Sequence, residues 1–198
     1  MSKIGSKVKI FSALEVANIC GVVNQTAINW IKSGFLKAFT TPGGQYRVYA
    51  NDLAAFLETR RMKKSGEVLQ VLMEKANWNA LLIAAEETIN HKLKNELGGF
   101  LPNFLITQAF DGFDLGLGMA RGKPGFLLLD QDLPGVNLSN LLRLLKTDPA
   151  FGRPVVYFIG DSPKITEDFP DSENLIDRIF CKPVDSKEIY LSITSKES

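Results

Sequence analysis

Residues 11–58 have the sequence FSALEVANICGVVNQTAINWIKSGFLKAFTTPGGQYRVYANDLAAFLE. Near its start, Ser12 is followed three residues later by Glu15, which is the pattern of a capping box at the beginning of a helix. This first helix is predicted to end at Gly21. A second helix is predicted to begin with Asn24 as its N-cap. Two short helices joined by a turn that contains glycine predict a helix-turn-helix.

The second of these helices carries side chains suited to base recognition. In a helix-turn-helix, the N-terminal part of the second helix enters the major groove of DNA. Asn and Gln can pair with adenine edges, Thr can contact a thymine methyl group, and Lys can reach guanine or phosphate. The side chains expected to face outward are Asn24, Gln25, Thr26, Asn29, Trp30 and Lys32.

A hairpin is predicted after the second helix. Thr41-Pro42-Gly43-Gly44 forms a turn between two short strand-like runs. The tip and the returning strand present Gln45, Tyr46 and Arg47 beside the second helix, where an arginine can lie along a phosphate or enter the minor groove. The hairpin is therefore interpreted as a wing.

The order of these pieces resembles the MerR/excisionase-type winged helix-turn-helix. The pieces that carry the resemblance are the helix end SGFL, the wing GGQYRVY and the following helix DLAAFLE. The resemblance implies sequence-specific binding to double-stranded DNA, as a homodimer or as cooperative neighbours along the duplex. A small helical domain that binds protein instead of DNA is the alternative.

Charge is segregated along the 198 residues. Residues 1–64 hold ten Lys and Arg against three Asp and Glu, a net charge of +7, whereas the remainder holds thirteen against nineteen, a net charge of −6. A basic part joined to an acidic part is typical of a polyanion-binding module attached to a second module. No apolar run approaches the roughly 20 residues that span a bilayer, so we expect a cytoplasmic protein without membrane contact.

The acidic part has the pattern of an α/β domain. Near-continuous apolar runs alternate with helical patterns, which predicts a doubly wound, five-stranded parallel sheet; the runs are ALLIAA, FLITQAF, GFLLLD, PVVYFIG and RIFC. The carboxyl ends of such strands meet at one edge of the sheet. Glu86 and Glu87, Asp130 and Asp132, and Lys182 follow the first, third and fifth runs. Carboxylates opposite a lysine suit Mg²⁺ and a phosphoryl group.

This part resembles the receiver domain of two-component response regulators. The segment LLIAAEE is similar to the first receiver strand, GKPGFLLLDQDLPGVNLSNLLRLLKTDP to the phosphoacceptor segment, and RIFCKPV to the Lys-Pro strand. The resemblance implies that Asp130 accepts the phosphoryl group, that Lys182 is the phosphate-site lysine, and that Glu86, Asp130 and Asp132 hold Mg²⁺. It also implies a histidine kinase or another signalling protein as a partner.

Several positions depart from the receiver pattern. The departures are Ala85 in place of an acidic residue, Ile159 or Gly160 in place of Thr or Ser, and Ile179 in place of an aromatic switch residue. The fourth helix region, residues 164–177, is polar and contains a proline. Two interpretations stay open: phosphorylation of Asp130, or a receiver-like fold used for constitutive dimerisation, for partner docking or for a signal of another kind.

The predicted organisation is a winged helix-turn-helix at residues 8–60, a helical linker at residues 61–77 and a receiver-like domain at residues 78–198. Apolar residues around the linker either pack against a neighbouring domain or form a dimer seam; they are Leu57, Val68, Leu69, Leu72 and Met73. The two cysteines, Cys20 and Cys181, are predicted to be buried thiols.

The function expected from the sequence is that of a DNA-binding transcriptional regulator of response-regulator type, in which the receiver-like domain controls oligomerisation or docking. We expect no enzymatic activity. Two alternatives come from other classes of protein. One is an excisionase-like architectural protein that bends DNA, and the other is a signalling adaptor that does not bind DNA.

Overall fold

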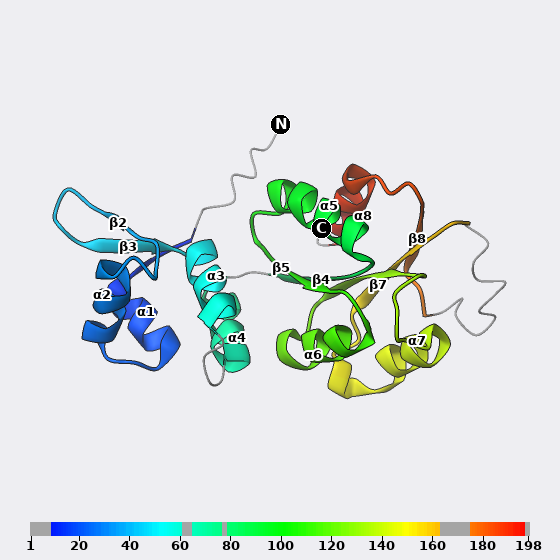
Figure 1. Ribbon diagram of the computed structural model, residues 1–198, viewed down its shortest axis with the longest axis horizontal. Coiled ribbons are helices and arrows are strands. Elements are labelled where there is room, and N and C mark those ends of the chain that lie inside the picture. The colour runs from blue at the N-terminus through cyan, green and yellow to red at the C-terminus, as the bar shows by residue number, and fades with distance from the viewer. Residues whose placement is uncertain (1–8, 61–64, 77–78, 163–174, 197–198) are drawn as a thin grey trace. The chain divides into compact units, whose positions relative to one another are not determined.

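The computed structural model describes residues 9–60, 65–76, 79–162 and 175–196. Contacts within the chain divide it into two compact units, residues 1–78 and 79–198, whose elements are drawn in Figure 1. Among the helices described, none combines the length and the apolar character needed to cross a membrane.

The first unit combines a small antiparallel sheet with helices. In chain order its elements are β1 (Ile10–Ser12), α1 (Ala13–Cys20), α2 (Asn24–Lys32), β2 (Phe39–Thr40), β3 (Tyr46–Tyr49), α3 (Ala50–Arg60) and α4 (Ser65–Ala76). The strand order is β1-β3-β2, so β3 is the central strand. The predicted helix-turn-helix is confirmed as α1 and α2, and the predicted hairpin as β2 and β3.

Local hydrogen bonds define both ends of α1. The Glu15 backbone N–H donates to the Ser12 hydroxyl at 3.2 Å, and the Ser12 backbone N–H donates to the Glu15 carboxylate at 2.8 Å, so the predicted capping box is present. The bonds from Ser12 lower the pKa of Glu15. The helix ends at Gly21, whose φ of 65° is a left-handed conformation that glycine adopts without steric cost.

The start of α2 differs from the prediction by one residue. Asn24 is the first helical residue, and Val23 precedes it as the cap without any side-chain hydrogen bond. The first turn closes through the backbone, because the Thr26 N–H donates to the Val23 carbonyl at 2.9 Å. The Asn24 side chain is therefore exposed instead of being used as a cap.

The wing is closed by two backbone hydrogen bonds. Gly44 N–H donates to the Thr41 carbonyl and Thr41 N–H donates to the Gln45 carbonyl, both at 2.9 Å. The sequence did not predict β1, which adds a third strand by pairing Ile10 with Tyr49 and Ser12 with Arg47. This pairing anchors the returning strand of the wing to the residues that cap α1.

Helix α4 packs within the first unit. It contacts α1 and α3, and Leu57 of α3 and Leu72 of α4 are completely buried. Because these two leucines are already buried, they are not available as a dimer seam. Val68, Leu69 and Met73 are half-buried, so the linker helix belongs structurally to the first unit.

The second unit is a doubly wound parallel sheet. Its elements are β4 (Asn79–Ala84), α5 (Glu87–Phe100), β5 (Phe104–Ala109), α6 (Gly112–Gly122), β6 (Phe126–Asp130), α7 (Leu138–Thr147), the 3-10 turn η1 (Pro149–Phe151), β7 (Val155–Gly160), β8 (Arg178–Cys181) and α8 (Ser186–Lys196). All strands pair in parallel in the order β5-β4-β6-β7-β8. The predicted α/β fold with a five-stranded parallel sheet is confirmed.

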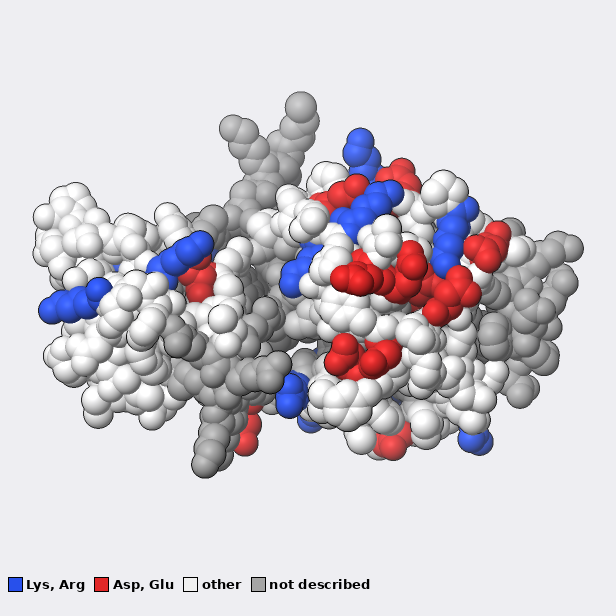
Figure 2. All heavy atoms as spheres, viewed as in Figure 1, with Lys and Arg blue, Asp and Glu red and all other residues white. Residues whose placement is uncertain are grey.

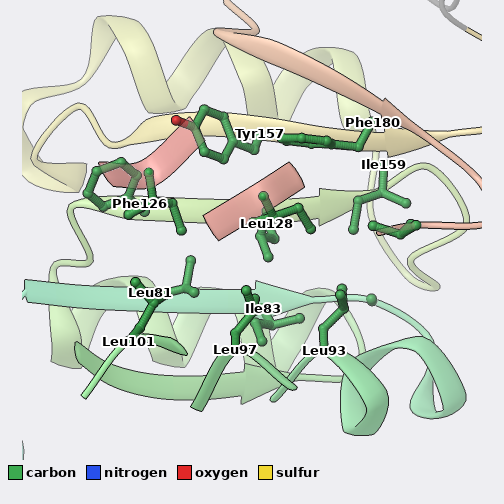
Figure 3. Close-up of a cluster of buried hydrophobic side chains, with 14 residues drawn as sticks. Leu81, Ile83, Leu93, Leu97, Leu101, Phe126, Leu128, Tyr157, Ile159 and Phe180 are labelled. Carbon is green, nitrogen blue, oxygen red and sulfur yellow. The ribbon is translucent and has the colours of Figure 1, made fainter. Parts of the chain in front are cut away.

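Helices cover both faces of this sheet, α5 and α8 on one and α6 and α7 on the other (Figure 1). Alternate strand residues supply the two cores, as Leu81 and Leu128 do on the α5 and α8 side and Leu82 and Leu127 on the other. Figure 3 shows the first of these cores, with side chains of β4, β6 and β7 meeting those of α5. The continuous apolar runs of the sequence thus reflect burial on both faces.

The two cysteines differ in burial. Cys20 is buried, and burial raises the pKa of its thiol to about 11. Cys181 is exposed, so its predicted burial is wrong; it is the last residue of the edge strand β8, where no further strand follows in the sheet order. The polar helix expected around residues 164–177 lies mostly outside the described residues.

Candidate functional site

The outward face of α2 is polar. Asn24, Gln25, Asn29 and Lys32 are exposed, and Thr26 is half-buried. On the opposite side of the helix Ala27 is completely buried. Gln25, Asn29 and Lys32 follow the spacing of one helical face. This set of three, termed the outward stripe, is not part of the core of the first unit.

Trp30 differs from the other predicted contact residues. Its ring lies 5.0 Å from the ring of Phe56 in α3, and the side chain is half-buried. The prediction that Trp30 faces outward is therefore corrected: this ring packs α2 against α3. Its position in the sequence, three residues after the buried Ala27, is the signal that could have identified this inward direction.

The wing presents one arginine on the open side of its sheet. Val48 is completely buried, and because strand residues alternate between faces, its neighbour Arg47 faces away from the core. The Arg47 guanidinium donates to the Gln45 side-chain oxygen at 2.7 Å and to the Tyr46 carbonyl at 3.0 Å. These bonds hold the cation along the returning strand, next to the tip of the wing.

Charge also distinguishes the two units. On the face of the second unit seen in Figure 2, Asp and Glu side chains gather among lysines and arginines. The exposed basic side chains described in the first unit include Lys9, Lys32 and Lys37. The charge division found in the sequence, after residue 64, falls inside the first unit, which extends to residue 78.

A second candidate site lies where β6 ends. Asp130 is the last residue of this strand and is completely buried. Lys182, which follows β8, places its Nζ 2.9 Å from Asp130 Oδ1 and 2.7 Å from Asp132 Oδ2. The Asp132 backbone N–H also donates to Asp130 Oδ1, at 2.9 Å. The sequence prediction that these three residues meet at one edge of the sheet agrees with this geometry.

Hydrogen bonds shift the pKa values of Lys182 and Asp132. Burial alone would lower the pKa of Lys182, but hydrogen bonds to Asp132 and Asp130 outweigh burial and raise it. The hydrogen bond from Lys182 lowers the pKa of Asp132. Asp130 Oδ2 is buried and has no hydrogen-bond partner among the described residues. Of the two Asp130 carboxylate oxygens, Oδ1 thus contacts the Lys182 ammonium group and Oδ2 does not.

A polar bridge beside this triad escaped the sequence analysis. The Gln131 side-chain amide donates to the Asp161 carboxylate, and the Asp161 backbone N–H donates back to the Gln131 side-chain oxygen at 3.2 Å. The bridge joins the residue after β6 to the residue after β7. The pairing of Asp130 with Ile159 in the sheet sets this register, and no local sequence pattern reports it.

The neighbours of Asp130 lack the usual polar groups of the receiver pattern. Ile159, directly beside it on β7, is completely buried and has no hydroxyl group. Ala85, after β4, is buried and supplies no carboxylate, whereas Glu86 is exposed at the start of α5. Ile179 is half-buried and Phe180 is buried in the opposite core. Within the described residues, no group of three or more His, Cys, Asp or Glu side chains could hold a metal ion.

Asn90 of α5 is a further buried polar residue at this edge. Its side-chain amide donates to the carbonyls of Ile83, Ala85 and Ala109 at 3.1, 3.2 and 2.7 Å. Its oxygen accepts from the side chain of Gln108 at 2.9 Å. Asn90 therefore fixes the ends of β4 and β5 to α5. A polar residue on an otherwise apolar helix face was the available signal.

Comparisons with known proteins agree with this division into two units. Residues 11–61 match the family described as a helix-turn-helix domain. Among curated proteins, none matches the chain.

Solved structures match the receiver part. The signal receiver domain of a DNA-binding response regulator from Colwellia psychrerythraea is 20% identical, covers 59% of this chain and 96% of its own, and has a TM-score of 0.53. A putative response regulator from Chloroflexus aurantiacus is 18% identical over 60% of this chain and 96% of its own, with a TM-score of 0.52. The response regulator TrrA from Thermotoga maritima, in complex with Mg²⁺ and BeF, is 17% identical. The match covers 59% of this chain and 97% of TrrA, with a TM-score of 0.50.

At these sequence identities the structural matches establish the fold of the second unit but not its biochemical role. The family match covers both helices of the helix-turn-helix, the wing and α3. Residues 11–61 are therefore a helix-turn-helix domain, and the chain continues into a domain with the fold of response-regulator receivers.

Proposed function

We propose that the chain is a DNA-binding transcriptional regulator of response-regulator type, and that its second unit controls how copies assemble or dock. The observation that carries the proposal is the outward stripe of α2, which is a polar helix face within a helix-turn-helix domain. The helix is followed in the chain by a wing that carries an arginine. A helix of this kind enters the major groove of a duplex.

Under this proposal the contact residues divide into two roles. Asn24, Gln25, Thr26, Asn29 and Lys32 belong to the helix that faces base edges. Gln45, Tyr46 and Arg47 belong to the wing, where contacts to the phosphate backbone position the protein without specifying a sequence. Trp30 supports α2 from within the first unit and contacts no base.

We propose further that the second unit acts without phosphorylation of Asp130. The carboxylate is completely buried and already carries a hydrogen bond from Lys182 and another from the Asp132 backbone. A phosphoryl group on Asp130 would also lack a hydroxyl donor at Ile159. These features favour constitutive dimerisation or docking of a signalling protein over a phosphorelay with a histidine kinase.

The residues at this edge do not fit a preformed Mg²⁺ site. A hard cation needs several oxygen ligands, and the second acidic position after β4 is Ala85. Asp132 is engaged by Lys182 at 2.7 Å, and Glu86 is exposed. Among the described residues, Asp130 Oδ2 is the one buried side-chain oxygen without a hydrogen-bond partner, and in our proposal Lys182 supplies the positive charge of this site.

Duplex binding is tested by its salt dependence. The full-length chain should bind duplex DNA with an affinity that falls steeply as salt is added, because each phosphate contact releases counterions. Arg47→Ala should weaken binding to all sequences about equally and reduce the salt slope by about 1. Lys75→Ala, which removes an exposed cation of α4 in the same unit, is the matched control and should leave the slope unchanged.

The alternatives give different results. A strong bend in the bound duplex with several adjacent sites would favour an architectural protein. Absence of binding at low salt would remove the DNA-binding proposal and favour an adaptor that binds protein.

The phosphorylation question has its own experiment. The full-length chain is incubated with acetyl phosphate and Mg²⁺, and its intact mass is measured beside an ordinary receiver and the Asp130→Asn variant. We expect no added phosphate under conditions that label the ordinary receiver. A mass increase of one phosphate that Asp130→Asn abolishes would refute the phosphorylation-independent proposal.

A further inference from the structure

Two amide side chains are joined on the outward stripe of α2. Gln25 Nε2 donates to Asn29 Oδ1 at 3.0 Å, and both residues are exposed. Ala27, on the opposite side of the helix, is completely buried. The joined amides therefore point away from their own unit, toward whatever the helix binds.

This hydrogen bond leaves a fixed set of groups for a ligand. Each amide has one oxygen acceptor and one NH₂ donor group. The bond engages one N–H of Gln25 and one lone pair of Asn29 Oδ1, so the Gln25 oxygen keeps its full capacity as an acceptor and the Asn29 NH₂ its full capacity as a donor. If Asn29 donated to Gln25 instead, one donor and one acceptor would again remain. The outcome does not depend on the direction of the bond.

One base matches an adjacent acceptor and donor in the major groove. Adenine presents the N6 amino group as a donor and N7 as an acceptor, whereas guanine presents two acceptors, cytosine a single donor and thymine an acceptor beside a methyl group. An internal hydrogen bond also restricts both side chains before binding, which reduces the conformational entropy lost on contact.

We propose that Gln25 and Asn29 act as one coupled reader of a single A·T base pair. Gln25 accepts from adenine N6 and Asn29 donates to adenine N7. The inference rests on the proposed duplex binding and goes beyond it, because it assigns both amides to the same base pair and names that base pair. Two amides that acted independently would contact two different base pairs.

The test locates the base pair that each residue reads. Duplexes are selected with the full-length chain from a library with a randomised centre, and affinities are then measured for the selected site with each base pair replaced in turn. We expect one A·T pair whose replacement weakens binding by roughly 5- to 150-fold. Gln25→Ala and Asn29→Ala should both remove the preference at that same pair, and the double variant should remove no more.

A matched control and a substitution with an altered preference sharpen the test. Asn18→Ala, which removes an exposed amide of α1 outside the proposed contact residues, should leave the preference at that A·T pair intact. Gln25→Glu has no donor at its end, so Asn29 must donate to it and turn its own oxygen outward. The pair then presents the Asn29 oxygen and a carboxylate oxygen as acceptors, and the preferred base should change from adenine toward cytosine, whose N4 is a donor.

The outcomes separate this inference from the function on which it rests. If the two alanine variants relax different base pairs, or if their effects add in the double variant, the amides read independently and the coupled reader is refuted. If duplexes bind but the preference survives both substitutions, the coupled reader is likewise refuted while DNA binding stands. If the chain selects no duplex at low salt, the proposed function itself fails.

Discussion

Replacing Lys182 by methionine tests whether this lysine neutralises the buried Asp130. The substitution keeps an unbranched side chain and removes the ammonium group that lies 2.9 Å from Asp130 Oδ1. The remaining donor to Asp130 is the Asp132 backbone N–H at 2.9 Å. A completely buried carboxylate would then be left without a cation.

The expected cost follows from these contacts. Breaking one side of a buried ion pair costs ~3–5 kcal/mol. The lower end applies because the Lys182 side chain is 21% exposed, so water can approach the vacated position. We expect Lys182→Met to lower the free energy of unfolding of the second unit by about 3 kcal/mol. For a domain of this size that corresponds to a melting temperature about 12 °C lower.

Neutral pH is the right condition for this measurement. The pKa of Lys182 is raised in the folded chain, so its stabilising contribution is complete below the unfolded value of ~10.4 and is lost as pH rises through the folded value. The pKa of Asp132 is lowered, so its contribution is complete above ~3.9 and is lost as pH falls through the folded value. Between these limits the Lys182–Asp132 ion pair is fully formed.

The assay is calorimetry of the full-length chain, in which Leu57→Ala identifies the transition of the first unit. A double-mutant cycle with Asp130→Asn isolates the pairwise contribution. In the Asp130→Asn background the carboxylate charge is absent, so Lys182→Met should cost about 1 kcal/mol or less, an estimate from the modest worth of exposed ion pairs. An equal cost of Lys182→Met in both backgrounds would contradict the proposed neutralisation.

Three further predictions concern other parts of the chain. Asn90→Ala removes the donor shared by three buried carbonyls and should lower the free energy of unfolding by about 3 kcal/mol in urea titrations. Gly112→Ala places a Cβ 2.4 Å from the Gly135 carbonyl oxygen. This variant should lower the free energy of unfolding by about 2 kcal/mol in the same titration. Gly116→Ala on the same helix is the control, because its Cβ meets open space. A maleimide should label the exposed Cys181 in the folded chain at pH 8. Cys20 is buried and has a pKa of about 11, so it should react only on unfolding. Equal labelling rates of the two cysteines would refute this difference in exposure.

The sequence predicts features that depend on neighbouring residues. The Ser12–Glu15 capping box and the left-handed Gly21 are local, because each involves residues within one turn of the chain. The wing turn is equally local, since residues 41–45 close it themselves. The parallel, five-stranded character of the second unit follows from the alternation of apolar runs and helical patterns, whereas its strand order was not predicted. The capping box, the wing turn and the parallel sheet can therefore be predicted from the sequence alone.

The features that escaped prediction depend on distant segments. β1 is three residues long and exists because β3 pairs with it. The inward direction of Trp30 depends on Phe56 in a later helix. The bridge from Gln131 to Asp161 joins two loops whose proximity is fixed only by sheet register. In each case the sequence shows the residue type but not the partner.

The proposed function also constrains how the two units must act together. α2 is nine residues long and has a narrow outward stripe, so one copy makes few base contacts, each worth ~1–3 kcal/mol. Joining two copies makes the second contact intramolecular, which raises overall affinity by ~10²–10⁴ without any new contact. If Asp130 is neutralised by Lys182 instead of being phosphorylated, assembly is not switched by a phosphoryl group. Occupancy of DNA would then follow the concentration of the chain, or of a partner docked on the second unit, by mass action.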